Sequence, residues 1–99
     1  MFAVLVRFHL GAESRRRAVQ AMLDVAPLMI GVDGLRSIDV LEDPDDPLRP
    51  ALYEIWDDRA SWETFSGNRP PQIAAQTATI ASCFAGPPET LTFNILERH

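Results

Sequence analysis

The first residues of the chain constrain its fold most, because they predict a strand with two apolar faces. Hydrophobic side chains alternate along Phe2 to His9 with the two-residue period of a β-strand. One face is wholly apolar, and the other begins with Ala3 and Leu5 before Arg7 makes it polar. A strand with a single buried face carries polar groups along its second face. We therefore expect this strand in the middle of a sheet, covered on both sides.

The remaining elements follow from changes in hydrophobic period and from the Gly and Pro residues between them. A helical period predicts helices over residues 13–30, 58–67 and 71–84. Two-residue alternation predicts further strands over residues 35–42, 51–57 and 89–97, the first two of which should form a hairpin. Gly31 and Gly34 are expected in left-handed conformations after the first helix. With the short helix counted inside the second crossover, the order of elements is βαββαβ.

This order predicts a single ferredoxin-like α+β domain over residues 1–99. The right-handed crossover rule gives an antiparallel sheet in the order 4-1-3-2 with the helices on one face. The other face would be bare and apolar, with Leu5, Tyr53 or Ile55, and either Ile38 and Val40 or Leu35 and Leu41. Because a monomer rarely exposes such a patch, we expect a homodimer.

Composition and charge exclude several classes of function. The net charge of −5, with no basic stripe, opposes binding to nucleic acid or to an anionic membrane. The apolar run at Phe2 to Val6 is too short for a membrane span or a secretion signal, which predicts a cytoplasmic protein. Cys83 is the single cysteine, which excludes an intrachain disulfide, and the absence of lysine excludes Schiff-base chemistry.

We expect no resident metal, heme or flavin. The sequence has no histidine cluster, no cysteine set and no glycine-rich phosphate loop. The loop over residues 43–50 carries three aspartates, which could indicate a calcium or magnesium site. Its oxygens lack the regular spacing and the glycine turn of a calcium loop, so we interpret it as a solvated connection.

The segment LYEIWDDRASWETF, together with the order of elements, resembles the antibiotic-biosynthesis monooxygenase family. The most specific part is an E-x-W strand followed by an acidic pair and a helical aromatic, here Glu54, Trp56, Asp57, Asp58 and Trp62. The resemblance extends over nearly the whole chain. It implies a dimeric α+β barrel with a cavity between sheet and helices. Several members of this family oxidise polycyclic phenols or anthrones with molecular oxygen and without metal or flavin.

Glu54 and Trp56 are the candidate catalytic residues. Alternation along the third strand places Leu52, Glu54 and Trp56 on the face toward the helices. Burial there would raise the pKa of Glu54, so that it could accept a phenolic proton. The structural alternative is an ion pair between Glu54 and an arginine. The resemblance implies that Trp56 is the strand-end tryptophan that lines the cavity of the family.

Trp62, Phe65, Gln76 and Phe8 are the candidate substrate-binding residues. The two tryptophans and Phe65 could form a flat-sided pocket for aromatic ligands, or they could be ordinary core residues. The amide of Gln76 lies near the position where the resemblance implies an arginine in some relatives, and it could bind a carbonyl group. Phe8 lies on the apolar face of the first strand that should meet the helices.

Two classes of function are compatible with these residues. The first is a cofactor-independent monooxygenase that acts on a small aromatic, polyketide-like substrate; retained Glu54 and the tryptophan pair favour it. The second is a non-catalytic or regulatory dimer that binds a small ligand. The resemblance favours it at two positions, since oxidising relatives carry asparagine where this chain has Leu52 and tyrosine where it has Trp62. The heme-degrading branch of the family has a histidine on the third helix, which this chain lacks.

Overall fold

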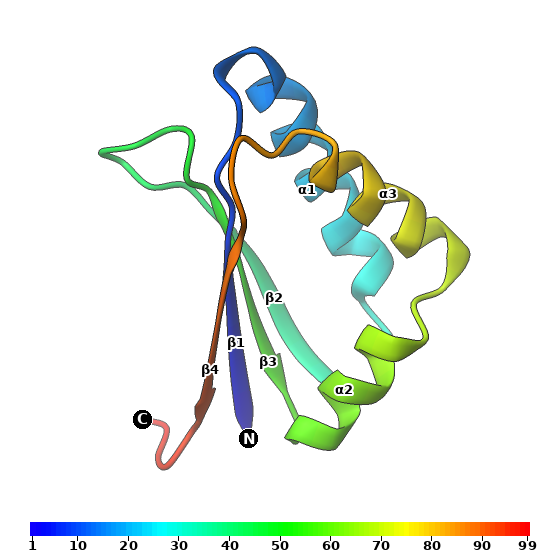
Figure 1. Cartoon of the computed structure of the whole chain (residues 1–99). Helices are drawn as coiled ribbons and strands as arrows, with labels where there is room; N and C mark the ends of the chain where they lie inside the picture. Colours follow the sequence, from blue (N-terminus) through cyan, green and yellow to red (C-terminus); the bar gives the residue numbers. More distant parts are fainter.

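A four-stranded antiparallel sheet carries all the helices on one of its faces (Figure 1). The computed structural model describes all 99 residues. Its strands are β1 (Phe2–Arg7), β2 (Leu35–Leu41), β3 (Ala51–Trp56) and β4 (Glu89–Asn94). Its helices are the short 3-10 turn η1 (Ala12–Ser14), α1 (Arg15–Met29), α2 (Arg59–Gly67) and α3 (Pro71–Ala81). The strand order β2-β3-β1-β4 is the predicted 4-1-3-2 order counted from the opposite edge, which confirms the ferredoxin-like fold.

β1 lies in the interior of the sheet, as its two apolar faces predict. It pairs antiparallel with β3 along one edge and with β4 along the other. Val4 on the helix side is 0% exposed, and Ala3 on the opposite side is 3% exposed. The core between sheet and helices contains Phe2 and Val4 together with Met22 and Val25 from α1.

The elements are one to three residues shorter than predicted, β1 for example ending at Arg7 instead of His9, and the largest differences at a single end are in α3 and β4. α3 ends at Ala81 instead of continuing to Phe84, since the N–H groups of Cys83 and Phe84 bond back to carbonyls in the last turn of the helix. Phe84 instead forms an isolated bridge with Leu10. β4 ends at Asn94, the partner of Phe2 at the start of β1, and beyond it the N–H of Ile95 bonds to the carbonyl of Met1. Cys83, the single cysteine, is buried.

A β-bulge in β2 decides which apolar residues face the helices. Leu35 pairs with Trp56 whereas Ser37 pairs with Ile55, so the register shifts by one residue between them. An extra residue in one strand reverses the alternation on either side of it. Leu35, Ile38 and Val40 therefore all pack against the core. Of the four residues that were expected in alternative pairs on the bare face, only Leu41 lies there.

The turn from α1 to β2 depends on two glycines in left-handed conformations, as predicted. Gly31 has φ 94° and Gly34 has φ 84°. The Gly34 carbonyl accepts a hydrogen bond of 2.7 Å from the N–H of Asp57. The next residue, Asp58, caps α2 by accepting a bond of 2.8 Å from the N–H of Ser61. Gly34 thereby fixes the position at which α2 begins, and its Cα lies directly against Ser61.

The sheet face opposite the helices is uncovered (Figure 1). Register places Leu5, Tyr53 and Ile55 at its centre. Towards its edges Leu41, Leu91 and Phe93 are exposed by 41%, 43% and 54%. No helix has the length and apolar character needed to cross a membrane.

We propose that a second copy of the chain covers this face. Sedimentation velocity at micromolar concentration should then show a dimer. Phe93→Glu, which puts a charge into the proposed interface, should shift the dissociation constant upward by about 100-fold or more. Ile30→Glu is the matched control, because Ile30 is 76% exposed but lies at the end of α1, on the helix side. A wild-type protein that stays monomeric on concentration would contradict the proposal.

Gly34→Ala should destabilise the fold more than Gly31→Ala. At both positions alanine has to adopt the left-handed backbone conformation of the glycine, which costs about 1–2 kcal/mol. A methyl group at Gly31 meets no atom within 4 Å, whereas one at Gly34 overlaps Ser61. Overpacking adds about 1–3 kcal/mol at Gly34. Urea unfolding of the two variants measures the difference, and equal losses would show that α2 moves away freely.

Candidate functional site

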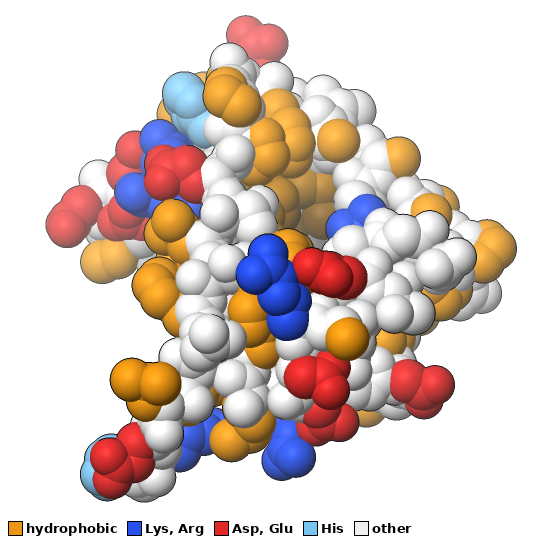
Figure 2. All heavy atoms as spheres, turned by 60° about the horizontal axis from the view of Figure 1, so that its bottom comes forward, with side chains coloured by type: hydrophobic (Ala, Val, Ile, Leu, Met, Phe, Trp, Pro, Cys, Tyr) orange, Lys and Arg blue, Asp and Glu red, His pale blue; other side chains and the backbone are white.

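A cavity of about 270 Å³ lies between the sheet and the helices. Its wall is formed by residues of β1, β3 and β4 on the sheet side and of α1, α2 and α3 on the other. Eleven of its 17 lining residues are hydrophobic. Figure 2 shows the molecule hollowed on this side, with hydrophobic side chains in the hollow. A largely apolar cavity with a few polar groups is the usual form of a small-molecule site.

Glu54 is the one carboxylic acid in the cavity wall. The alternation of β3 points it toward the helices, as predicted, and its side of the strand is covered so well that the residue is 6% exposed. Burial raises the pKa of Glu54 above its ordinary value of 4.5, while the hydrogen bond from Trp56 and the positive charge of Arg69 lower it in part. No arginine lies within ion-pair distance of Glu54, so the structural ion pair considered above is wrong.

Trp56 lies behind Glu54 and does not line the cavity. Its indole Nε1 donates a hydrogen bond of 2.9 Å to the Oε1 atom of Glu54. The ring is 0% exposed because α2 covers the end of β3, with the Phe65 ring at a centroid distance of 5.3 Å. The implied cavity-lining position of Trp56 therefore differs from its place in the structure. Trp56 acts on the cavity only through Glu54, whose carboxyl group it holds in place.

One face of α2 and the residue just past its end supply the wall opposite the sheet. Trp62, Phe65, Ser66 and Arg69 all line the cavity. Their spacing of i, i+3, i+4 and i+7 is that of one helical stripe. Trp62 also packs against Phe2 of β1, at a ring distance of 5.6 Å. The predicted positions of Trp62 and Phe65 near Glu54 agree with this geometry.

Phe8 and α3 form the far wall. Phe8 follows β1 and stacks on Phe84 with ring centroids 5.5 Å apart. The residues of α3 that line the cavity share one face of the helix, namely Ile73, Thr77, Ile80 and Ala81. Gln76 instead lines a shallow hollow on the surface between α3 and α1, together with Arg16 and Gln20 of α1. Phe8 is thus part of the cavity wall. Gln76 is not, because it lies on a different face of α3.

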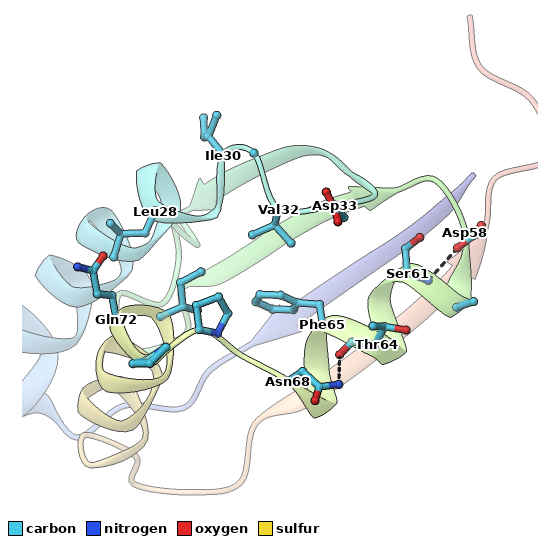
Figure 3. A pocket seen from close by; sticks show the side chains of 15 residues that line it. Leu28, Ile30, Val32, Asp33, Asp58, Ser61, Thr64, Phe65, Asn68 and Gln72 are labelled. Carbon is cyan, nitrogen blue, oxygen red and sulfur yellow. Dashed lines mark hydrogen bonds between the residues drawn. The ribbon is translucent and has the colours of Figure 1, made fainter.

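A second, more open groove lies on the outer side of α2 (Figure 3). Leu28 and Ile30 at the end of α1 form one side, and Thr64 on α2 and Asn68 just after it form the other. Phe65 and Ile73 line both this groove and the cavity. These two side chains therefore separate the groove from the cavity.

The acidic loop over residues 43–50 is held by its own hydrogen bonds. Asp43 accepts bonds from the N–H groups of Asp45 and Asp46, and it pairs with Arg7 at 2.9 Å. The backbone bond from Asp45 is the main reason that the pKa of Asp43 lies below its usual value. No group of three His, Cys, Asp or Glu side chains is placed to hold a metal ion.

Sequence reasoning missed Ser66 and Arg69. Gly67 to Pro70 indicates a break between two helices, and such a break gives no sign that the residues on either side of it share a face. The available signal was the helical spacing from Trp62, because residues three, four and seven positions later share its face. Arg69 keeps that face although α2 ends at Gly67.

Comparison with known proteins finds a family match over residues 1–76 and solved structures of the same fold over nearly the whole chain. The family model of the antibiotic biosynthesis monooxygenases (ABM) matches residues 1–76. A candidate antibiotic biosynthesis monooxygenase from Nitrosomonas europaea superposes with a TM-score of 0.87 at 21% identity, covering 98% of this chain and 100% of that one. Rv0793 from Mycobacterium tuberculosis gives 0.85 at 21% identity, with 98% and 96% covered. A candidate from Deinococcus radiodurans gives 0.85 at 17% identity, with 100% and 96% covered. No curated protein matches the sequence.

Glu54→Gln should change how stability depends on pH. Because the folded-state pKa of Glu54 is raised, its contribution to stability is fully present below about pH 4.5 and is lost as the pH rises through the folded value. The variant lacks this loss, so its unfolding free energy relative to wild type should increase with pH over that window. Urea unfolding at a series of pH values measures the difference.

Glu63→Gln is the control for this experiment. Glu63 is exposed and pairs with Arg59 on the surface of α2, so its replacement should shift stability by less than about 1 kcal/mol at neutral pH. Asp43 and Asp58, whose pKa values are lowered by backbone hydrogen bonds, make both proteins lose stability at acid pH. This loss is common to variant and wild type, so it cancels when the wild-type curve is subtracted. A flat difference between Glu54→Gln and wild type would show that the Glu54 carboxyl is not buried in solution.

Proposed function

Because the chain belongs to the antibiotic biosynthesis monooxygenase family, we propose that it is a monooxygenase that oxidises a small phenolic substrate in the cavity beside Glu54. The observation that carries this proposal is the single acid in a mainly apolar wall, Glu54, fixed by the indole of Trp56. A base with a raised pKa is matched to the removal of a weakly acidic proton near neutral pH. The aromatic side chains of Trp62, Phe65 and Phe8 offer the flat surfaces that a planar ring needs.

The proposed role of Glu54 is to take the phenolic proton. The resulting phenolate is electron-rich and can itself reduce dioxygen, so no other reductant is required. A ring carbon bonds to one oxygen atom, and the second oxygen leaves as water when the O–O bond breaks and the carbonyl forms. For a naphthol the products are a naphthoquinone and water, which balances all atoms and electrons.

The hydrogen bond from Trp56 holds the carboxyl group of Glu54 in a fixed position. It fixes one carboxyl oxygen of Glu54 and leaves the other free to face the cavity. It also lowers the pKa of Glu54 against the effect of burial. Trp56 is thus a positioning residue for the base in the proposed reaction.

The second candidate function is a binding dimer without catalysis. It is supported by the composition of the wall, where Leu52 and the indole of Trp62 occupy cavity positions and carry no acidic or basic proton-transfer group. Such a cavity still selects planar ligands by shape. The two functions differ in one measurable property, which is oxygen consumption with a bound ligand.

Oxygen uptake and tryptophan fluorescence test the proposed function together. 2-Naphthol should quench the fluorescence of Trp62 and should be oxidised in air with consumption of dioxygen. Glu54→Gln keeps the shape of the side chain but removes the base, so turnover should fall about 100-fold or more while affinity changes little. Trp56→Phe removes the hydrogen-bond donor, which should raise the pKa of Glu54 and move the acidic limb of the pH profile to higher pH.

Gln76→Ala is the control, because Gln76 lies outside the cavity. It should leave both binding and turnover unchanged. Ligand binding without any oxygen uptake would favour the binding dimer over the enzyme. Oxidation that is unaffected by Glu54→Gln would remove Glu54 from the role of base, and the absence of any quenching would overturn both functions.

A further inference from the structure

Arg69 is a cation in the cavity wall without a partner in the protein. All nine basic residues apart from the histidines are arginines. Most of them make ion pairs or donate side-chain hydrogen bonds. Only Arg16 and Arg69 do neither, and Arg16 lies on the outer surface of α1. Arg69 lines the cavity and is itself exposed, which places it at the mouth.

Ser66 supplies a second unsatisfied group in the same wall. Its Oγ atom is buried and has no hydrogen-bond partner. It is the single buried side-chain nitrogen or oxygen in this state. An unpaired buried hydroxyl is unfavourable, and a ligand atom that accepts its hydrogen bond would relieve this.

The head group of Arg69 is held in place without being neutralised. Its guanidinium carbon lies 5.6 Å from the centre of the Phe65 ring, within the range of a cation–π contact. Its nitrogens are more than 4.0 Å from the carboxyl oxygens of Glu54, although both residues line one cavity. Arg69 is exposed at the mouth whereas Glu54 is 6% exposed, so the cavity has a positive end toward solvent and an acid that lies deeper, although the charge of Arg69 still lowers the pKa of Glu54 in part.

Resting on the proposed function, we propose that the substrate is a small hydroxyaromatic carboxylic acid whose carboxylate binds Arg69 and the Ser66 hydroxyl. A carboxylate only accepts hydrogen bonds, and both of these groups donate them. The Glu54 end repels an anion but accepts a bond from a phenol. The two ends thus orient the ligand with its carboxylate at the mouth and its hydroxyl group at the base.

The size of the cavity limits the ring system. Pockets for drug-sized ligands occupy about 300–1,000 Å³. The volume here, about 270 Å³, lies just below that range. One or two fused rings fit this space better than the larger polycyclic phenols that the family resemblance implies.

A matched pair of ligands tests the inference by calorimetric titration at neutral pH. The acid is 6-hydroxy-2-naphthoic acid, and 2-naphthol has the same rings and hydroxyl without the carboxylate. Wild-type protein should bind the acid about 10-fold or more tightly than the naphthol. Arg69→Gln should abolish this preference without changing naphthol affinity. Arg69→Lys, which keeps the charge but not the two-pronged geometry, should retain part of it.

Ser66→Ala separates binding from structure. Because the Ser66 hydroxyl has no partner in the free protein, its removal should leave the melting temperature unchanged or slightly higher. The affinity for the acid should nevertheless fall about 3- to 10-fold, with no change for 2-naphthol. Arg16→Gln is the control for removing one unpaired positive charge outside the cavity, and it should alter neither affinity.

The outcomes distinguish this inference from the function on which it rests. If 2-naphthol binds and the acid binds no more tightly, the carboxylate site is wrong while the phenol site stands. If the preference for the acid survives Arg69→Gln, Arg69 is not the anion-binding residue and the inference fails. If neither ligand binds, both the inference and the proposed function are overturned.

Discussion

β1 forms hydrogen bonds with β3 along one edge and with β4 along the other, and its side chains need cover on both faces of the sheet. The helices provide that cover on one face only. α1 packs closely over β2 and buries Met22 and Val25 in the core. The half of the sheet formed by β1 and β4 has a looser cover, and the space left there is the cavity. The same central strand thus gives rise to the core, the cavity and the uncovered face.

The cavity combines an apolar wall with polar groups that are only partly compensated. Glu54 has one hydrogen-bond partner, the indole of Trp56, and no counter-ion at contact distance. Ser66 has no partner. Arrangements of this kind reduce the stability of a small domain, where a few kcal/mol are a large part of the total. They are compatible with folding here because the core beneath α1 and the fixed start of α2 at Gly34 are well packed.

The element order, the sheet order and the left-handed glycines could be predicted because they follow from local periods and from chain connectivity. The direction of Glu54 followed from alternation along β3. The bulge at Leu35 could not be predicted, since one extra residue leaves no mark in the hydrophobic pattern that distinguishes the two possible faces. The place of Trp56 behind Glu54 depends on how α2 packs across the end of β3, which is a tertiary contact. Ser66 and Arg69 were hidden by a helix break that does not interrupt the face they share with Trp62.

Both ionisable groups of the cavity come from one short stretch, since Glu54 is on β3 and Arg69 follows the next helix. The other walls, from β1, α1, α3 and β4, contribute no charge. The charged groups of the cavity are therefore confined to residues 54–69, while a large part of its apolar wall comes from other parts of the chain. Substitutions in α3 or β4 can reshape the space for a new ring system while the acid and the cation stay in place. In such a fold, the shape of the cavity can evolve through its apolar lining alone, without any change to the acid or the cation.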